Sequence, residues 1–254
     1  MTRSHSCLAW SGRLGVGLAV VLSLGACPAL AEGPRLGLFG ERAMDPSRSM
    51  GPPIARYVSE DGDVFVLDRT NSHPLLKFQD NPEVFALQSQ PAPRGDVIYK
   101  NDVGEPVLRA TRLGGVTLFT NERPEGSAAM LAGDGPALRL PILGPQALLE
   151  RLAQASARAT RAARRLIPFE ADASPGSSAV VADAALVAAE AVVRLAKRPN
   201  GQGLLARLGR IQLIEGTSPN AFVQQGVMQI TVDPGQGLAG RPSSDRIMAA
   251  IGAR

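Results

Sequence analysis

Three groups of residues in this chain are of types that can do chemistry. The run Gly235-Gln236-Gly237-Leu238-Ala239-Gly240 fits the G-x-G-x-x-G pattern of dinucleotide-binding loops. His73 is the one histidine after residue 31, and a histidine is a common base beside a nucleophilic serine. The densest group of carboxylates, which could bind Ca²⁺ or divide acid and base roles, consists of Glu60, Asp61, Asp63 and Asp68.

Each group lacks the surroundings that its chemistry needs. A dinucleotide-binding loop opens a long helix within a βαβ unit, whereas Pro242 follows this glycine run at once, so a flexible connector is expected. No G-x-S-x-G surrounds any serine, and His73 is interpreted as a turn or surface residue before Pro74. The carboxylates do not follow EF-hand spacing, and Asp61-Gly62 is expected to form a turn. The sequence therefore predicts no catalytic, cofactor-binding or metal-binding residues.

A stripe of arginines is the remaining candidate, and it lies on the first expected helix. Glu150 is the one acidic residue among them. Facing outward, the stripe could meet anionic lipid headgroups or an acidic envelope protein. The default interpretation is a solvated face, or a face paired with acidic neighbours in the fold. The docking hypothesis rests on Arg151, Arg158, Arg161, Arg164 and Arg165.

Residues 1–31 have the three parts of a secretory signal peptide. Arg3 and Arg13 precede the apolar run Leu14 to Leu24, which is shorter than the roughly 20 residues of a membrane span. Ala29-Leu30-Ala31 supplies the small-x-small cleavage pattern, so we expect a periplasmic or secreted chain after cleavage near Ala31. The alternative is lipid anchoring at Cys27, because Leu24-Gly25-Ala26-Cys27 resembles a bacterial lipobox.

Cleavage would change which reactive residues the chain contains and what net charge it carries. Both cysteines, Cys7 and Cys27, lie in the leader, so the mature chain would have no disulfide and no thiol chemistry. Without Arg3 and Arg13, 25 basic residues of the 27 face 23 acidic ones, which leaves a net charge of +2. This small charge gives no support to a nucleic-acid partner, and we expect none. We also expect no transmembrane span in the mature chain.

The pattern of the remaining chain predicts an α+β fold. Residues 32–53 are rich in Gly and Pro and indicate a flexible N-terminal arm, and residues 54–254 indicate a single domain. Its first part, 54–142, has short strands separated by turns, which favours an antiparallel β-rich body. Two Ala-rich helices are expected in 145–198, and a C-terminal β-hairpin with a short helix in 207–254. The hairpin is predicted to pair Ile211–Glu215 with Val223–Val232.

The β-rich part resembles a known family in several blocks. These are RYVSEDGDVFVLDR from Arg56, PLLKF from Pro74, EVFAL from Glu83 and RGDVIYKNDVGEPVLRATRLGGVTLFT from Arg94. They are similar to an uncharacterised proteobacterial family, domain of unknown function 4908. The resemblance implies an exported bacterial protein and brings no catalytic residues, because the family has no established activity.

The sequence thus favours a non-catalytic periplasmic protein that binds or scaffolds another envelope component. One alternative is a hydrolase that acts on an envelope polymer through carboxylates alone, for which a cleft with two carboxylates is required. Another is a lipid-anchored surface protein, which the fate of Cys27 decides.

Overall fold

The computed structural model describes residues 51–253 of the chain. Contacts place all of the described residues in one compact unit. The predicted leader and residues 32–50 of the predicted arm lie outside the described residues. The α+β fold class is confirmed, with a large antiparallel sheet followed by helices and a smaller sheet.

The first sheet consists of two antiparallel meanders, which are joined where the first strand pairs with the ninth. The strands are β1 (Ile54–Ser59), β2 (Val64–Asp68), β3 (Leu75–Phe78), β4 (Val84–Ala86), β5 (Gln88–Pro91), β6 (Val97–Lys100), β7 (Pro106–Ala110), β8 (Val116–Leu118) and β9 (Ser127–Asp134). All of their pairings are antiparallel. The turns at Gly62 and Gly104 both have positive φ, which glycine adopts at little cost, and the turn expected at Asp61-Gly62 is confirmed.

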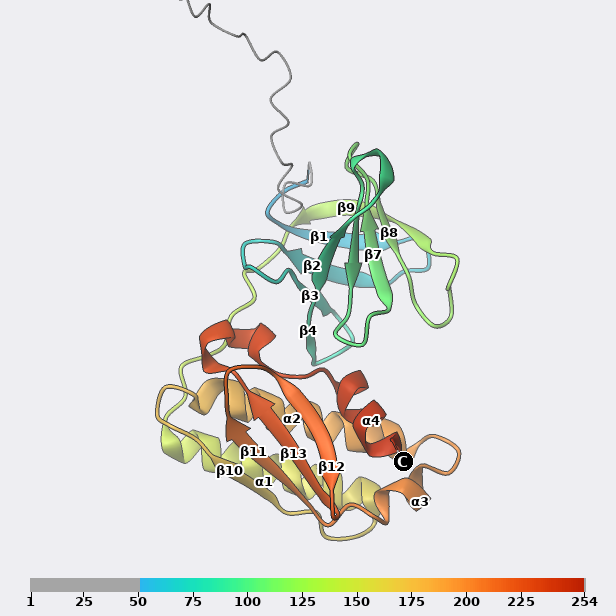
Figure 1. Cartoon of the computed structure of the whole chain (residues 1–254). Helices are drawn as coiled ribbons and strands as arrows, with labels where there is room; N and C mark the ends of the chain where they lie inside the picture. The colour runs from blue at the N-terminus through green and yellow to red at the C-terminus, as the bar shows by residue number, and fades with distance from the viewer. Residues whose placement is uncertain (1–50, 254) are drawn as a thin grey trace, which may run out of the picture. The chain divides into compact units, whose positions relative to one another are not determined.

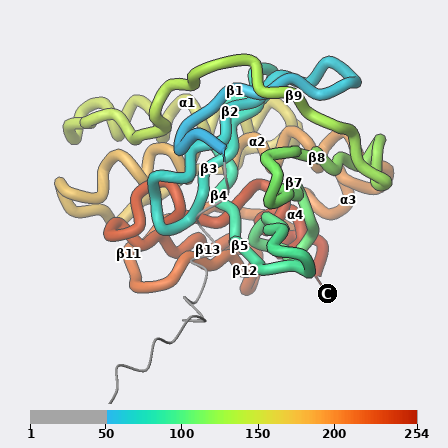
Figure 2. Tube along the Cα trace, turned by 90° about the horizontal axis from the view of Figure 1, so that it is seen from above, coloured from blue at the N-terminus to red at the C-terminus, as the bar shows by residue number. Residues whose placement is uncertain are grey.

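This sheet closes into a ring. In the order of pairing, β4 and β5 are the two outer strands, yet Leu87 alone separates them in the chain. One residue spans about 3.5 Å, so the two edges meet there. Figure 2 shows the strands following one another around the ring. Closure leaves few free strand edges, which protects such a sheet from pairing with other chains.

Apolar side chains fill the interior of the ring. Tyr99, Leu108 and Leu118 are fully buried and come from neighbouring strands. An aromatic row continues across β1 to β4, with ring centroids 5.5 to 6.2 Å apart, through Tyr57, Phe65, Phe78 and Phe85. Alternation of buried and exposed residues along β6 and β7 places one face of each strand inward.

The second half of the chain is a sheet covered on one face by helices (Figure 1). The sheet order is β10-β11-β13-β12, and the helices α1, α2 and α4 lie against it. The helices are α1 (Pro145–Ala163), α2 (Ser178–Ala196), α3 (Gly201–Leu205) and α4 (Ser244–Gly252), and a 3₁₀ segment, η2, spans Pro234–Gly240. The strands are β10 (Phe169–Asp172), β11 (Arg210–Glu215), β12 (Asn220–Gln224) and β13 (Val227–Val232).

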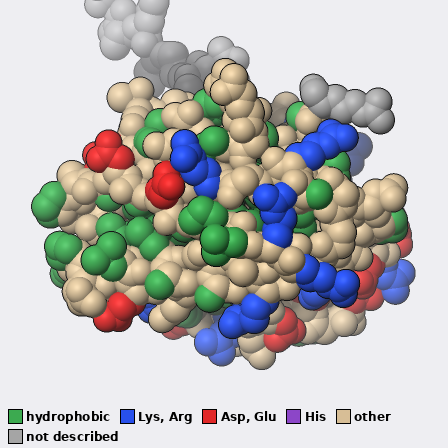
Figure 3. Space-filling view, turned by 90° about the horizontal axis from the view of Figure 1, so that it is seen from below, with side chains coloured by type: hydrophobic (Ala, Val, Ile, Leu, Met, Phe, Trp, Pro, Cys, Tyr) green, Lys and Arg blue, Asp and Glu red, His purple; other side chains and the backbone are tan. Residues whose placement is uncertain are grey.

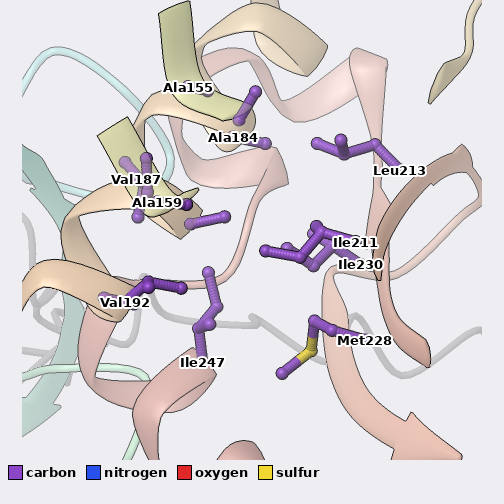
Figure 4. Packing of buried hydrophobic residues seen from close by; sticks show 14 of the residues in the cluster. Ala155, Ala159, Ala184, Val187, Val192, Ile211, Leu213, Met228, Ile230 and Ile247 are labelled. Atoms are coloured by element: carbon purple, nitrogen blue, oxygen red, sulfur yellow. The ribbon is translucent and has the colours of Figure 1, made fainter. Parts of the chain in front are cut away.

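Small side chains let the two long helices pack closely. Ala155 and Ala159 of α1 face Ala184 of α2, and all three are fully buried. The other side of α2 packs on Ile211 and Ile230 of the sheet (Figure 4). Because α2 is covered by α1 on one side and by the sheet on the other, most of its residues are apolar.

The prediction that Ile211–Glu215 and Val223–Val232 form a hairpin is wrong in the strands that it pairs. Residues 223–232 do not form one strand, because Gln225 and Gly226 both have positive φ and turn the chain between β12 and β13. The hairpin is therefore β12–β13, and β11 lies parallel to β13. The sequence did not predict the parallel strand β10.

Candidate functional site

The five predicted arginines fall into three groups on α1 and directly after it. Arg161 is in the last turn of the helix, and Arg164 and Arg165 follow its end, where all three are exposed. Arg158 forms an ion pair with Glu190 of α2. Arg151 is exposed near the beginning of the helix, away from the others. The structure thus gathers three of the five at one helix end.

The end of α1 is held beside the end of α2 and beside α3. The ion pair between Arg158 and Glu190 joins the C-terminal halves of the two helices, five and six residues before their ends, so both end on the same side. Gln202 of α3 donates a hydrogen bond of 3.0 Å to the carbonyl of Ala162, and Arg165 donates one to the carbonyl of Ala206. These contacts bring a second stretch of chain to the predicted arginines.

That stretch supplies four more exposed basic residues, which the sequence analysis missed. They follow α2, lie between α3 and β11, or begin β11. We call the combined set the basic end, and it consists of Arg161, Arg164, Arg165, Lys197, Arg198, Arg207 and Arg210. A signal was present in the sequence, because neither 151–169 nor 191–214 contains an Asp or a Glu.

The charges of the basic end are largely uncompensated within residues 51–253. Arg210 lies 3.8 Å from Glu170, with both side chains half exposed, and such a pair contributes little. Among the described residues, the side chains of Arg161, Arg164, Lys197, Arg198 and Arg207 have neither a hydrogen bond nor an ion pair.

Helix dipoles explain part of this charge but not most of it. Each helix carries about half a negative charge at its C-terminal end, and cations there are stabilising. Two such ends, α1 and α2, call for about one positive charge in total. The seven basic residues exceed that amount several times over. The surplus therefore has another basis than the stability of the helices.

Leu166 adds an apolar side chain to the basic end. It follows Arg164 and Arg165 directly, and 71% of its surface is exposed. Close by, the beginnings of β10, β11 and β13 surround a shallow depression of about 570 Å³, lined by Pro168, Glu170 and Arg210 among others. Figure 3 looks at the molecule from the side on which α3 lies and shows Lys and Arg side chains together with apolar ones on that face.

His73 and the glycine-rich run meet at two pockets. A pocket of about 310 Å³ is lined by His73, Arg139 and the segment 235–239, and one of about 210 Å³ by His73, Asp102 and Arg246 among others. His73, Gln236 and Ala239 line both. Neither these pockets nor the depression has two carboxylates in its lining, so none of the three provides the pair that the hydrolase alternative requires.

The glycine run has a structural reason. It forms η2, which folds back so that the Asp233 amide donates to the Gly240 carbonyl at 2.7 Å. A Cβ on Gly240 would lie 1.9 Å from the carbonyl oxygen of Asp233, and Gly237 has a φ of +56°. No long helix follows, because the chain is extended at Arg241 before α4. The segment is a tight connector, as the sequence suggested, although it is an ordered one.

A buried ionic cluster links η2 and α4 to the strand ring. Glu83 and Arg241 are each 1% exposed and lie 3.5 Å apart, and Arg241 also pairs with Asp183 of α2. Arg241 donates to the carbonyl of Val84 at 2.9 Å, and the amide of Ser244 donates to Glu83 at 2.9 Å. Burial raises the pKa of Glu83, although Arg241 and Ser244 oppose that shift. These groups are bonded to one another within the protein, so we assign the cluster a structural role.

The acidic group singled out in the sequence does not assemble into a metal site. Asp68 accepts hydrogen bonds from Thr70 and from the amide of Leu138, whereas Asp61 pairs with Arg123 and Asp63 with Ser59. Burial would raise the pKa of Asp68, but those hydrogen bonds outweigh it and lower the pKa. Within residues 51–253, no three His, Cys, Asp or Glu side chains are arranged to hold a metal ion.

Comparison with known proteins identifies the family of the chain. Within the part that the structure describes, no helix combines the length and the apolar character needed to cross a membrane. No curated protein and no solved structure shows significant similarity to the chain. A family model described as "Domain of unknown function (DUF4908)" matches residues 38–251, which covers the whole of both sheets and nearly all of α4. The chain therefore belongs to this domain-of-unknown-function family, as the resemblance of its β-rich blocks had suggested.

Proposed function

We propose that the chain is an exported bacterial envelope protein that acts by binding, without catalysis of its own, and that the basic end holds an anionic component of the envelope. The observation that carries this proposal is the set of seven exposed basic side chains, of which one has an acidic partner among the described residues. Like charges repel, so such a set is unfavourable unless an anionic partner compensates it.

The location belongs to the same proposal. Residues 1–31 have the composition of a secretory leader, and cleavage near Ala31 would deliver the chain to the periplasm. The family that the chain resembles is proteobacterial, and the envelope of such bacteria contains a periplasm, which agrees with this location. The inner-membrane and outer-membrane faces that bound this compartment supply anionic lipids and acidic proteins, and both are candidates for the component.

The proposal is tested by crosslinking a tagged chain in living cells. The variant Arg161→Gln/Arg164→Gln/Arg165→Gln removes three charges of the basic end. A matched control, Arg112→Gln/Arg139→Gln/Arg151→Gln, removes three exposed arginines elsewhere that have no side-chain hydrogen bond or ion pair within residues 51–253. We expect envelope association and capture to fall in the first variant and to stay at the wild-type level in the control. Equal capture by all three chains would contradict the proposal.

A further inference from the structure

The chemistry of the basic end distinguishes between a lipid surface and an acidic protein. Charge alone attracts either partner. The exposed Leu166, set directly beside Arg164 and Arg165, is the feature that separates them. Charge pairing with the carboxylates of an acidic protein does not itself require an apolar side chain among the arginines. A bilayer takes both, since headgroups pair with the guanidinium groups and the interface beneath them accepts an apolar side chain.

The arrangement of the neighbouring groups agrees with contact to a broad surface. The basic residues come from four places in the chain, namely the end of α1, the end of α2, the segment after α3 and the first residue of β11. They surround no deep cavity, and the depression beside Arg210 is shallow. A small anion would be held by converging donors, whereas these side chains are spread over one end of the helical layer.

We propose that the basic end docks the protein onto an anionic phospholipid surface, with Leu166 entering the interface. This inference rests on the proposed function and names its anionic component. Each arginine near an anionic leaflet contributes enough that its removal weakens binding about fivefold. Removal of three therefore weakens binding by about a hundredfold.

The test is sedimentation of the full chain, produced with its native N-terminus, with lipid vesicles. Two compositions are compared, phosphatidylcholine alone and phosphatidylcholine with an equal part of phosphatidylglycerol. We expect binding to the anionic vesicles alone, with loss of binding in concentrated salt because screening shortens the reach of the charges. Binding to both compositions alike, or to neither, would overturn the lipid proposal.

Three variants assign the contact to the residues named. Lys197→Gln/Arg207→Gln removes two charges that have no partner within residues 51–253, so it leaves the fold intact, and it is expected to weaken binding more than tenfold. Leu166→Ser is expected to weaken binding while the dependence on salt remains. The matched control is Arg112→Gln/Leu113→Ser, because Leu113 is 90% exposed next to an arginine in the turn between β7 and β8. If vesicle binding by this control fell as much as binding by the variants of the basic end, the assignment would be refuted.

The experiment in cells separates this inference from the proposed function. If the vesicles are not bound but an acidic protein is captured in a way that depends on Arg161, Arg164 and Arg165, the lipid partner is wrong and the binding function stands. If neither the binding of vesicles nor the capture of a protein in cells depends on these arginines, both proposals fail.

Discussion

The carboxyl group of Glu83 is buried in the contact between the strand ring and α4, where carboxyl groups are rare. Its neighbours Arg241 and Ser244 stabilise the charge, but the loss of water outweighs them and raises its pKa. A buried ion pair of this kind gives little net stability, because desolvation costs about as much as the attraction gains. Its consequence for the protein is the dependence of stability on pH.

That dependence can be isolated by comparing the wild type with Glu83→Gln. Because the folded pKa of Glu83 is raised, its contribution is fully present below the unfolded value of about 4.3 and is lost as pH rises through the folded value. The free energy of unfolding of the wild type, minus that of Glu83→Gln, should therefore decrease as pH rises from this value. Urea denaturation at a series of pH values measures the difference, and an increase with pH would mean that the ion pair with Arg241 dominates.

At the scale of elements, the glycines of η2 differ in what they permit. Gly240→Ala would place a Cβ 1.9 Å from the carbonyl oxygen of Asp233, which accepts a hydrogen bond from the amide of Gln236 and cannot move without disturbing it. At Gly235 the nearest atom would be a carboxylate oxygen of Asp233 at 3.2 Å, on a side chain that can shift. We expect Gly240→Ala to lower the free energy of unfolding by about 1–3 kcal/mol and Gly235→Ala to change it by less than about 0.5 kcal/mol. Chemical denaturation of both variants checks this, and equal effects would be contrary to it.

Elements with a strong local pattern could be predicted, and those that depend on distant partners could not. The spacing of Leu148, Leu152 and Ala155 indicates α1, and the Asp61-Gly62 turn indicates the first hairpin, since both signals lie within a few residues. By contrast, β10 has four residues and pairs with β11 alone, so its strand character comes from a partner 42 residues further along the chain. The turn between β12 and β13 was missed because Gln225 occupies a position of positive φ that Asn or Gly usually takes.

The candidate site could be predicted in part for the same reason. The sequence predicted one group of five arginines because all of them fall on the first expected helix, and three of the five belong to the basic end. Arg207 and Arg210 join them through contacts such as that of Gln202 with Ala162. Only the fold shows that these residues share a surface. It also removes Arg158 from the free charges, since its partner Glu190 lies on another helix.

For the whole molecule, a surface kept for binding carries a cost in stability. Because Lys197 and Arg207 lie among like charges and lack partners within residues 51–253, neutralising them with glutamine should not destabilise the protein. We expect the melting temperature of Lys197→Gln/Arg207→Gln to equal or exceed that of the wild type, with a larger difference at low salt. Calorimetry at two salt concentrations measures this. A clear loss of stability would show that these charges serve the helix ends instead of a partner.

The closed ring of strands determines when this protein can fold. Its first strand, β1, pairs on one side with β9. Ala55 of β1 lies opposite Asp134, which comes 79 residues later in the chain. Until β9 has left the ribosome or the translocation machinery, β1 has one side without a partner, and the loop to be closed is long, which slows folding. In the helical half the most distant strand pair, β10 with β11, spans 42 residues, which is about half the span of the pair of β1 with β9. The ring is thus the slow-folding half, although its strands come first in the chain, and it is there that a chaperone would be needed.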